Sequence, residues 1–161
     1  MKHWKDALFA LFIVSGLTFW MQKDMLAQGS QASQFILPTL DNSAASIINP
    51  NQPTLVYFFA PWCSICKLSM GNLSTVQNKI NTIVVALDYQ DRTEVVNFIT
   101  DINVTVPILL GNPVVSKHYQ VSSYPSYYII DGKGKVLDRS SGYSSLAGLL
   151  WRTSNINIDK G

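Results

Sequence analysis

The chain has 161 residues, of which 47% are apolar and 14% charged, and its net charge is +2. This length accommodates one domain of ordinary size with a short appendage, and the composition is that of a folding chain. The basic residues are scattered without a cluster, which excludes a stripe that binds nucleic acid. The 2 cysteines are too few for a disulfide framework, which leaves a redox pair, half of a metal site or a small structural bridge.

The amino-terminal segment predicts a membrane anchor. An uncharged apolar run covers residues 7–21, and Trp4 and Trp20 flank it as interfacial side chains do. The run is short for a membrane span and at the top of the range for the apolar region of a signal peptide, so a cleaved signal and a buried core helix stay as alternatives to a retained anchor. We interpret residues 1–22 as the anchor or signal and expect a single transmembrane helix there.

The charges around this run predict that the rest of the chain is exported. Lys2 and Lys5 precede the run, whereas Lys23 and Asp24 after it cancel each other. By the positive-inside rule, the amino terminus stays in the cytoplasm. We therefore expect a bacterial inner-membrane protein that crosses once and faces the periplasm, where disulfides persist. A polar linker is expected at 23–33.

The remainder, 34–161, reads as one α/β domain. Continuous apolar runs at 54–59 and 82–87 predict buried strands, and the helical stretch between Cys63 and about Lys79 joins them into a parallel βαβ unit. The other expected elements are a short edge hairpin near 35–43, helices at 92–102 and 113–119, a short apolar segment at 106–110, a hairpin turning at 131–134 and a last helix at 144–151.

The cysteines, Cys63 and Cys66, lie where a predicted strand gives way to a predicted helix. Free N–H groups and the positive end of the helix dipole stabilise an anion at such a position. Cysteines placed there have a lowered pKa, between roughly 3.5 and 7.5, and exist partly as the thiolate. Cys66, one helical turn further on, can close a disulfide with Cys63.

A lone C-x-x-C pair also occurs with other chemistries. Zinc would need further ligands, and the nearest downstream histidine is His118; haem attachment would need His where Lys67 stands. A peroxiredoxin-type peroxidase would need Thr where Ala60 stands. Two thiolates can bind Cu(I), with Met70 as a possible third ligand, and this alternative stays open beside a structural bridge, which would close too small a loop to stabilise much.

The order of these elements resembles the thioredoxin fold, a central mixed sheet flanked by helices, over roughly residues 34–154. The most specific parts are FFAPWCSIC at 58–66 and VSSYPS at 121–126, the second of which is similar to the family's cis-proline loop. With an anchor in front, the chain resembles the exported TlpA/ResA-like thiol–disulfide oxidoreductases. KDM at 23–25 and SGY at 141–143 resemble, more narrowly, the suppressor-of-copper-sensitivity D-type proteins.

The resemblance implies a role for each site residue. Cys63 would be the attacking nucleophile, being nearer the exposed helix start, and Cys66 would resolve the mixed disulfide. Trp62 would shield the pair and offer a flat apolar face to a partner. Pro125 would be cis, and the backbone of Tyr124 beside it would hydrogen-bond a bound peptide as a strand does.

The sequence departs from the family at positions that handle protons. Many thioredoxins carry a buried Asp six residues before the first cysteine, where this chain has Tyr57. Many TlpA/ResA-like proteins carry Glu three residues after the second cysteine, with Pro two further on, where Ser69 and Gly71 stand. Neither carboxylate is therefore available to assist proton transfer.

These observations predict an exported, membrane-tethered thiol–disulfide oxidoreductase that acts on the cysteine pair of a partner protein. The resemblance favours the reductive direction, with electrons from a membrane-embedded carrier. The Cys63–Cys66 disulfide would be the only redox group, with no bound cofactor or metal. An exported disulfide oxidase or isomerase is the alternative within this class, and a Cu(I)-binding protein of metal-stress tolerance is the alternative outside it.

Overall fold

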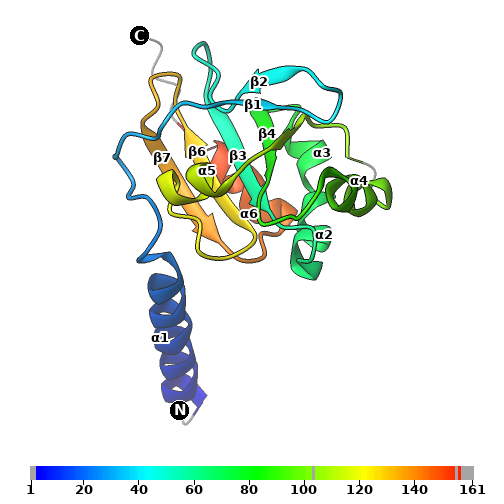
Figure 1. Ribbon diagram of the computed structural model, residues 1–161. Helices are drawn as coiled ribbons and strands as arrows, with labels where there is room; N and C mark the ends of the chain where they lie inside the picture. Colours follow the sequence, from blue (N-terminus) through cyan, green and yellow to red (C-terminus); the bar gives the residue numbers. More distant parts are fainter. Residues whose placement is uncertain (1–2, 103, 155, 157–161) are drawn as a thin grey trace.

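A five-stranded mixed sheet forms the centre of the domain (Figure 1). The computed structural model describes residues 3–102, 104–154 and 156, so Met1 and Lys2 of the expected anchor lie outside the described residues. The strands, in the order β5-β4-β3-β6-β7 across the sheet, are β3 Thr54–Phe59, β4 Asn81–Ala86, β5 Ile108–Leu110, β6 Ser126–Ile130 and β7 Val136–Ser141. β3, β4 and β5 run parallel, whereas β6 is antiparallel to β3 and β7 to β6.

Alternating side chains of β3 divide the core into two halves. Tyr57 and Phe59 point to one face of the sheet and Phe58 to the other, and every residue of β3 is buried because the strand is central and covered on both faces. The first face is covered by α2 Ser64–Met70, α3 Leu73–Val76, α4 Arg92–Thr100 and α6 Leu146–Ser154. The second is covered by α5 Pro113–His118 and by the amino-terminal segment that contains the hairpin β1 Ile36–Pro38 and β2 Ala44–Ser46.

The expected continuous helix from Cys63 to about Lys79 is wrong, because the structure breaks it into α2 and α3. The hydroxyl of Ser69 donates a hydrogen bond to the carbonyl oxygen of Ile65 at 3.0 Å, a local bond that bends helices. Gly71, a poor helix former, follows at the end of α2. The break leaves Cys66 and Ser69 together on the buried side of a short active-site helix.

The segment 23–33, which we expected to be a linker, lies against the domain. Met25 and Ala32 are 3% and 4% exposed in the second half of the core. The amide of Ala32 donates to the carbonyl oxygen of Gly134 at 2.8 Å, and that of Gly29 to Val136 at 2.8 Å. These hydrogen bonds attach the segment to the turn that joins β6 and β7. The segment is therefore ordered up to the end of the amino-terminal helix.

The amino-terminal helix α1, His3–Gln22, projects away from the body of the domain (Figure 1). Its described side chains leave a wide apolar surface uncovered, including Trp4, Leu8, Phe9, Leu11 and Phe12, which are between 55% and 76% exposed. Among the residues that the structure describes, no helix is both long and apolar enough to cross a membrane. The expected transmembrane helix is therefore not shown by the structure.

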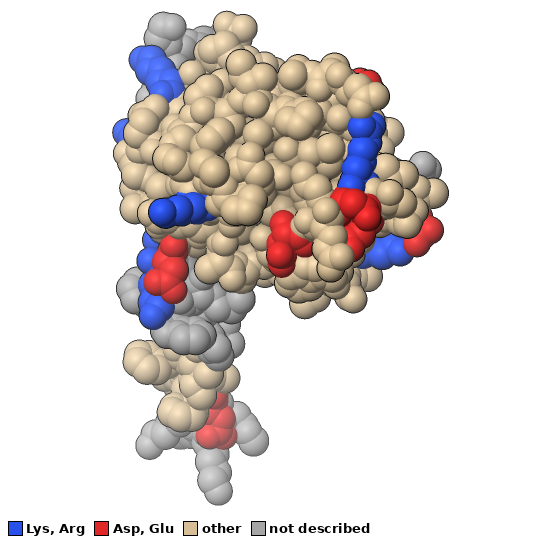
Figure 2. Space-filling model, viewed as in Figure 1, with Lys and Arg blue, Asp and Glu red and all other residues tan. Residues whose placement is uncertain are grey.

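Charged side chains are sparse on the face of the domain in Figure 2, and both signs are scattered among uncharged residues. Two ion pairs join elements within the described residues, Lys67 with Asp101 at 2.7 Å and Arg152 with Asp138 at 2.9 Å. This distribution agrees with the absence of a basic stripe in the sequence.

Buried tyrosines make the stability of the fold sensitive to alkaline pH. Burial raises the pKa of Tyr57, Tyr119 and Tyr127, and that of Tyr128 to about 12. The unfolded chain releases these protons near pH 10, whereas the folded chain holds them. The free energy of unfolding should thus be unaffected below about pH 10 and fall above it by about 1.4 kcal/mol per pH unit for each tyrosine. Urea unfolding across this range measures the slope.

The matched control for this prediction is Tyr143→Phe, at an exposed tyrosine. It should leave the alkaline slope unchanged, whereas Tyr128→Phe should lower the slope by one tyrosine's share. An equal slope in both variants would show that the buried phenol of Tyr128 is not one of its sources.

Candidate active site

The two cysteines form a disulfide at the start of α2, with their Cα atoms 5.3 Å apart. Cys63 follows the loop that leaves β3 and is the residue that caps α2. Its sulfur accepts a hydrogen bond from the amide of Cys66 at 3.1 Å. Cys63 is 6% exposed and Cys66 is 0% exposed, so the sulfur of Cys63 is the one that an incoming partner can reach.

Three chain segments meet at this edge of the sheet. β3 and β4 are parallel and end here, and β6, antiparallel to β3, begins here. Trp62 comes from the end of β3, Asp88 from the end of β4, and Tyr124 from the loop before β6. The topology therefore brings together side chains that are far apart in the sequence.

Trp62 is exposed but held from two sides. Its indole nitrogen donates to the carbonyl oxygen of Asp88 at 3.2 Å and to the Asp88 carboxylate at 3.1 Å. Its ring meets that of Tyr124 edge to face, with the centroids 5.6 Å apart. Because 64% of the side chain remains exposed, these contacts fix a flat apolar surface beside Cys63.

The peptide bond between Tyr124 and Pro125 is cis. Pro125 is buried, and its carbonyl oxygen accepts a hydrogen bond from the amide of Gly142 at 2.9 Å. Ser123 and Ser141 join the two ends of the β6–β7 hairpin through their hydroxyls at 2.7 Å. The loop that carries Tyr124 is thereby fastened to the sheet next to Trp62.

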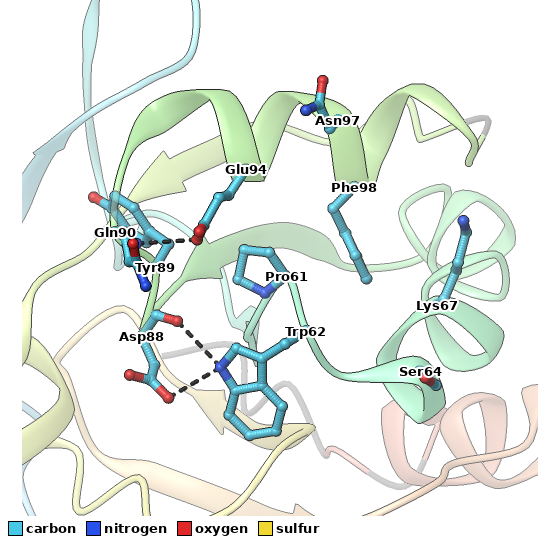
Figure 3. Close-up of a pocket in the computed structure, with 10 residues that line it drawn as sticks. All are labelled: Pro61, Trp62, Ser64, Lys67, Asp88, Tyr89, Gln90, Glu94, Asn97 and Phe98. Atoms are coloured by element: carbon cyan, nitrogen blue, oxygen red, sulfur yellow. Dashed lines mark hydrogen bonds between the residues drawn. The ribbon is translucent and has the colours of Figure 1, made fainter.

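A groove of about 780 Å³ opens beside the cysteine pair, between α2 and α4 (Figure 3). Phe98 and Pro61 contribute apolar surface to it, and Trp62 closes one end. Asp88 and Glu94 line the same groove. The carboxylate of Asp88 accepts a hydrogen bond from Trp62, and that of Glu94 accepts one from the amide of Gln90 at 3.0 Å. The groove can hold a side chain of a partner that approaches Cys63.

Asp88, Glu94 and Phe98 were not expected at this site. For Asp88 a signal was present, because it directly follows an apolar strand parallel to the one that leads to Cys63. Carboxyl ends of parallel strands meet at one edge, so a polar residue there is a candidate for the site. Glu94 and Phe98 are placed by the position of α4, which no local pattern specifies.

Beneath the disulfide, Tyr57 occupies the position where many thioredoxins have a buried aspartate. It is 0% exposed, and its hydroxyl donates to the carbonyl oxygen of Cys66 at 3.0 Å. Tyr127, its partner in the β3–β6 register, packs edge to face against it with ring centroids 4.9 Å apart. The departure from the family pattern thus leads to an aromatic and hydroxyl environment under Cys66.

A metal site is not formed by the residues described. Among them, no three His, Cys, Asp or Glu side chains gather closely enough to hold an ion. Met70, the third ligand weighed for Cu(I), lies one turn beyond Cys66 on α2 and is 1% exposed. The redox group that the structure does contain is the Cys63–Cys66 disulfide.

Comparisons with known proteins agree with this geometry. The chain is 28% identical over 152 residues to the thioredoxin-like protein YneN of Bacillus subtilis, covering 86% of this chain and 89% of the relative. It is 24% identical over 143 residues to sporulation thiol-disulfide oxidoreductase A of the same organism, covering 82% and 87%. Such relatives, together with the C-x-x-C pair, confirm the enzyme class predicted from the sequence, a thiol–disulfide oxidoreductase.

The fold is likewise shared with solved structures. The exposed lipoprotein thioredoxin Etrx1 of Streptococcus pneumoniae superposes with a TM-score of 0.67 at 21% identity, covering 76% of this chain and 98% of that one. The thioredoxin fold expected from the order of the elements is therefore confirmed. A model of the AhpC/TSA family matches residues 28–139, more than half of the chain, and the chain therefore belongs to that family.

Proposed function

We propose that this protein is an exported, membrane-held thiol–disulfide oxidoreductase that reduces a disulfide in a partner protein. The observation that carries the proposal is the position of Cys63, which caps α2 beside an exposed Trp62 and a groove wide enough for a partner's side chain. The reacting sulfur, its stabilising amide and a docking surface thus lie together at one edge of the sheet.

The chemistry follows from the two sulfurs. In the reduced protein the Cys63 thiolate attacks one sulfur of the partner disulfide, and the other leaves as a thiolate. Cys66 then attacks the sulfur of Cys63, which re-forms the internal disulfide and releases the partner in its dithiol form. The partner gains two electrons and the Cys63–Cys66 pair loses them. A membrane-embedded carrier is the proposed source from which the pair is reduced again.

The reductive direction is supported by what surrounds Cys63. Ser64 and Ile65, between the cysteines, carry no charge or imidazole that would strongly stabilise the thiolate. The amide of Cys66 is the hydrogen-bond donor to the Cys63 sulfur. A pair without a strongly stabilised reduced form is a poor oxidant.

A redox titration of the Cys63–Cys66 pair tests the direction. The expected midpoint lies near about −270 mV, the value of a thioredoxin, because the local environment offers only backbone stabilisation. Equilibration with glutathione or dithiothreitol buffers, followed by thiol counting, measures it. A midpoint near about −120 mV would instead make the protein a disulfide oxidase and reject the reductive proposal.

The membrane association is proposed from α1. Its described apolar side chains include many that are uncovered, and Phe9 and Phe12 are 67% and 76% exposed. Exposed apolar surface of this extent marks a region that contacts a partner or a membrane. The similarity to a protein described as an exposed lipoprotein thioredoxin supports the extracytoplasmic side.

Cell fractionation of the full chain tests the tether. The protein is expected in the membrane fraction, and the double change Phe9→Asp and Phe12→Asp should move most of it out of that fraction, because charged groups are costly in an apolar phase. Val114→Asp, at an exposed apolar residue on α5, serves as the control and should leave the distribution unchanged. Equal recovery of wild type and double variant outside the membrane fraction would reject the tether.

The narrower resemblance to suppressor-of-copper-sensitivity D-type proteins belongs to this proposal. Titrating the reduced protein with Cu(I), with and without Cys63, tests it against the copper-binding alternative. Tight binding that depends on Cys63, together with no reduction of protein disulfides, would make copper handling the function. Disulfide reduction without tight binding supports the oxidoreductase.

A further inference from the structure

Three buried hydroxyl groups gather on the inner side of the active-site helix, and we call Tyr57, Ser69 and Tyr127 the hydroxyl cluster. They are 0%, 0% and 2% exposed. Tyr57 donates to the carbonyl oxygen of Cys66 at 3.0 Å, and Ser69 to that of Ile65 at 3.0 Å. Two of the three stand at the positions where related proteins carry a proton-accepting carboxylate.

The hydroxyl of Tyr127 is the exception within the cluster. It is buried, and it makes no hydrogen bond of ordinary geometry with any residue that the structure describes. Ser69 and Ser144 nevertheless lie close enough to lower its pKa against the larger effect of burial. A buried donor without a partner costs on the order of 1–3 kcal/mol, and an acceptor that forms during the reaction would offset this cost.

The cluster is neutral over the physiological pH range. Burial raises the pKa of both Tyr57 and Tyr127, so neither phenol ionises near neutral pH. Two neighbouring titratable groups add to this effect. Tyr127 of β6 raises the pKa of Tyr57 on β3, and Tyr143, from the segment before α6, raises the pKa of Tyr127.

The charged groups on the elements packed around the cluster are engaged elsewhere. They are Lys67 of α2, paired with Asp101; Asp138 of β7, paired with Arg152 of α6; Arg139 of β7, which donates to the carbonyl oxygen of Met25; Arg92 of α4, which donates to the side chain of Asn42; Glu94 of α4, bound by the amide of Gln90; and Asp88, bound by Trp62. The polar side chains of the cluster, on the inner side of α2, are thus uncharged hydrogen-bond donors.

We propose that the hydroxyl cluster replaces the missing carboxylate by donating hydrogen bonds to the Cys66 thiolate as it forms, with Tyr57 positioning Cys66 and Tyr127 supplying the free donor. The proposal rests on the proposed exchange function and deepens it at the same site. In the resolving step, Cys66 loses its proton to water and its sulfur attacks Cys63; the bond from Cys63 to the partner sulfur breaks, and the partner leaves as a thiolate. Neutral hydrogen-bond donors favour the thiolate form of Cys66 without titrating themselves near neutral pH. A carboxylate base would instead add its own ionisation to the pH profile of the step.

A mixed disulfide between Cys63 and thionitrobenzoate isolates this step. Release of the coloured thiolate reports the attack by Cys66 alone, because no protein partner or electron carrier is needed. The rate as a function of pH follows the thiolate fraction of Cys66. Wild type should show a single ionisation, because Cys63 is blocked in the adduct and Cys66 is the thiol that titrates.

Tyr127→Phe removes the free donor and keeps the ring. The ionisation of Cys66 should move up by about one pH unit, which makes release about tenfold slower at neutral pH. Tyr57→Phe should act in the same direction. Tyr57→Asp, which restores a carboxylate, should add a second ionisation to the profile.

Tyr128→Phe is the matched control. Tyr128 neighbours Tyr127 on β6, is also a buried tyrosine, and points to the opposite face of the sheet, where its hydroxyl donates to the carbonyl oxygen of Tyr119 at 2.6 Å. Its release profile should equal that of wild type. The proposal is overturned if Tyr127→Phe leaves the profile unchanged, if Tyr128→Phe shifts it equally, or if wild type already shows a second ionisation.

These outcomes are separate from the fate of the proposed function. If wild type releases thionitrobenzoate with the expected profile but reduces no protein disulfide, the function fails and the role of the cluster stands. If protein disulfides are reduced and the profile is insensitive to Tyr127, the cluster fails and the function stands.

Discussion

Replacing Cys63 with serine is expected to abolish disulfide exchange, whereas replacing Cys66 with serine should trap a covalent adduct with the partner. The difference follows from exposure and from the helix start. Cys63 is the more accessible sulfur, and the amide of Cys66 already donates to it, so we expect it to make the first attack. Cys66 is fully buried, and we expect it to act only after that attack. Without its sulfur the mixed disulfide has no internal route to resolution.

The measurement is reduction of a protein disulfide, such as that of insulin, together with non-reducing electrophoresis of the products. The loss of rate on Cys63→Ser should approach the uncatalysed background, because Cys66, the one cysteine that then remains in the chain, is fully buried. Cys66→Ser should give a new band at the summed mass that disappears on adding a thiol reductant. Thr75→Ser, at an exposed position on α3, is the control and should behave as wild type. Loss of exchange in both cysteine variants without any adduct would contradict the assigned order of attack.

Local patterns were sufficient to predict the centre of this site. An apolar strand that ends at a C-x-x-C pair fixes where both sulfurs lie, because the strand and the following helix start are specified by adjacent residues. The same holds for the β6–β7 hairpin, whose turn contains Gly134 at a φ of +87°, a conformation that suits glycine. The roles of Cys63, Cys66, Trp62, Tyr124 and Pro125 in catalysis stay predictions.

What could not be predicted depends on contacts between distant segments. The departures at Tyr57 and Ser69 were visible in the sequence. That these two residues lie together with Tyr127 was not visible, because this depends on the β3–β6 register. The residues 23–33 are polar and small, as linkers are, yet their backbone groups hydrogen-bond to the β6–β7 turn. Composition describes side chains and carries no information about backbone pairing, so these hydrogen bonds could not be predicted.

Replacing Phe59 with alanine is expected to destabilise the domain by about 3–5 kcal/mol, since removing a buried aromatic ring leaves a cavity that the surroundings fill only in part. Phe59 is 0% exposed and stacks on Phe98 of α4 with ring centroids 5.0 Å apart. Domains of this size have a total stability of about 5–15 kcal/mol, so the loss is a large share of it. The urea midpoint at unchanged slope measures the effect.

The same ring joins the core to the site, so the substitution should also alter exchange in molecules that remain folded. Phe59 ends β3, and Ala60, the next residue, accepts a hydrogen bond from the amide of Cys63 at 3.0 Å. Phe98, which loses its stacking partner, lines the groove beside Trp62. Val96→Ala is the control. Val96 lies on α4, as Phe98 does, but is 37% exposed, so the substitution should change the free energy of unfolding by no more than about 0.5 kcal/mol. A Phe59→Ala protein within about 1 kcal/mol of wild type would mean that the core closes around the lost ring, and α4 would then have to move toward β3 and narrow the groove.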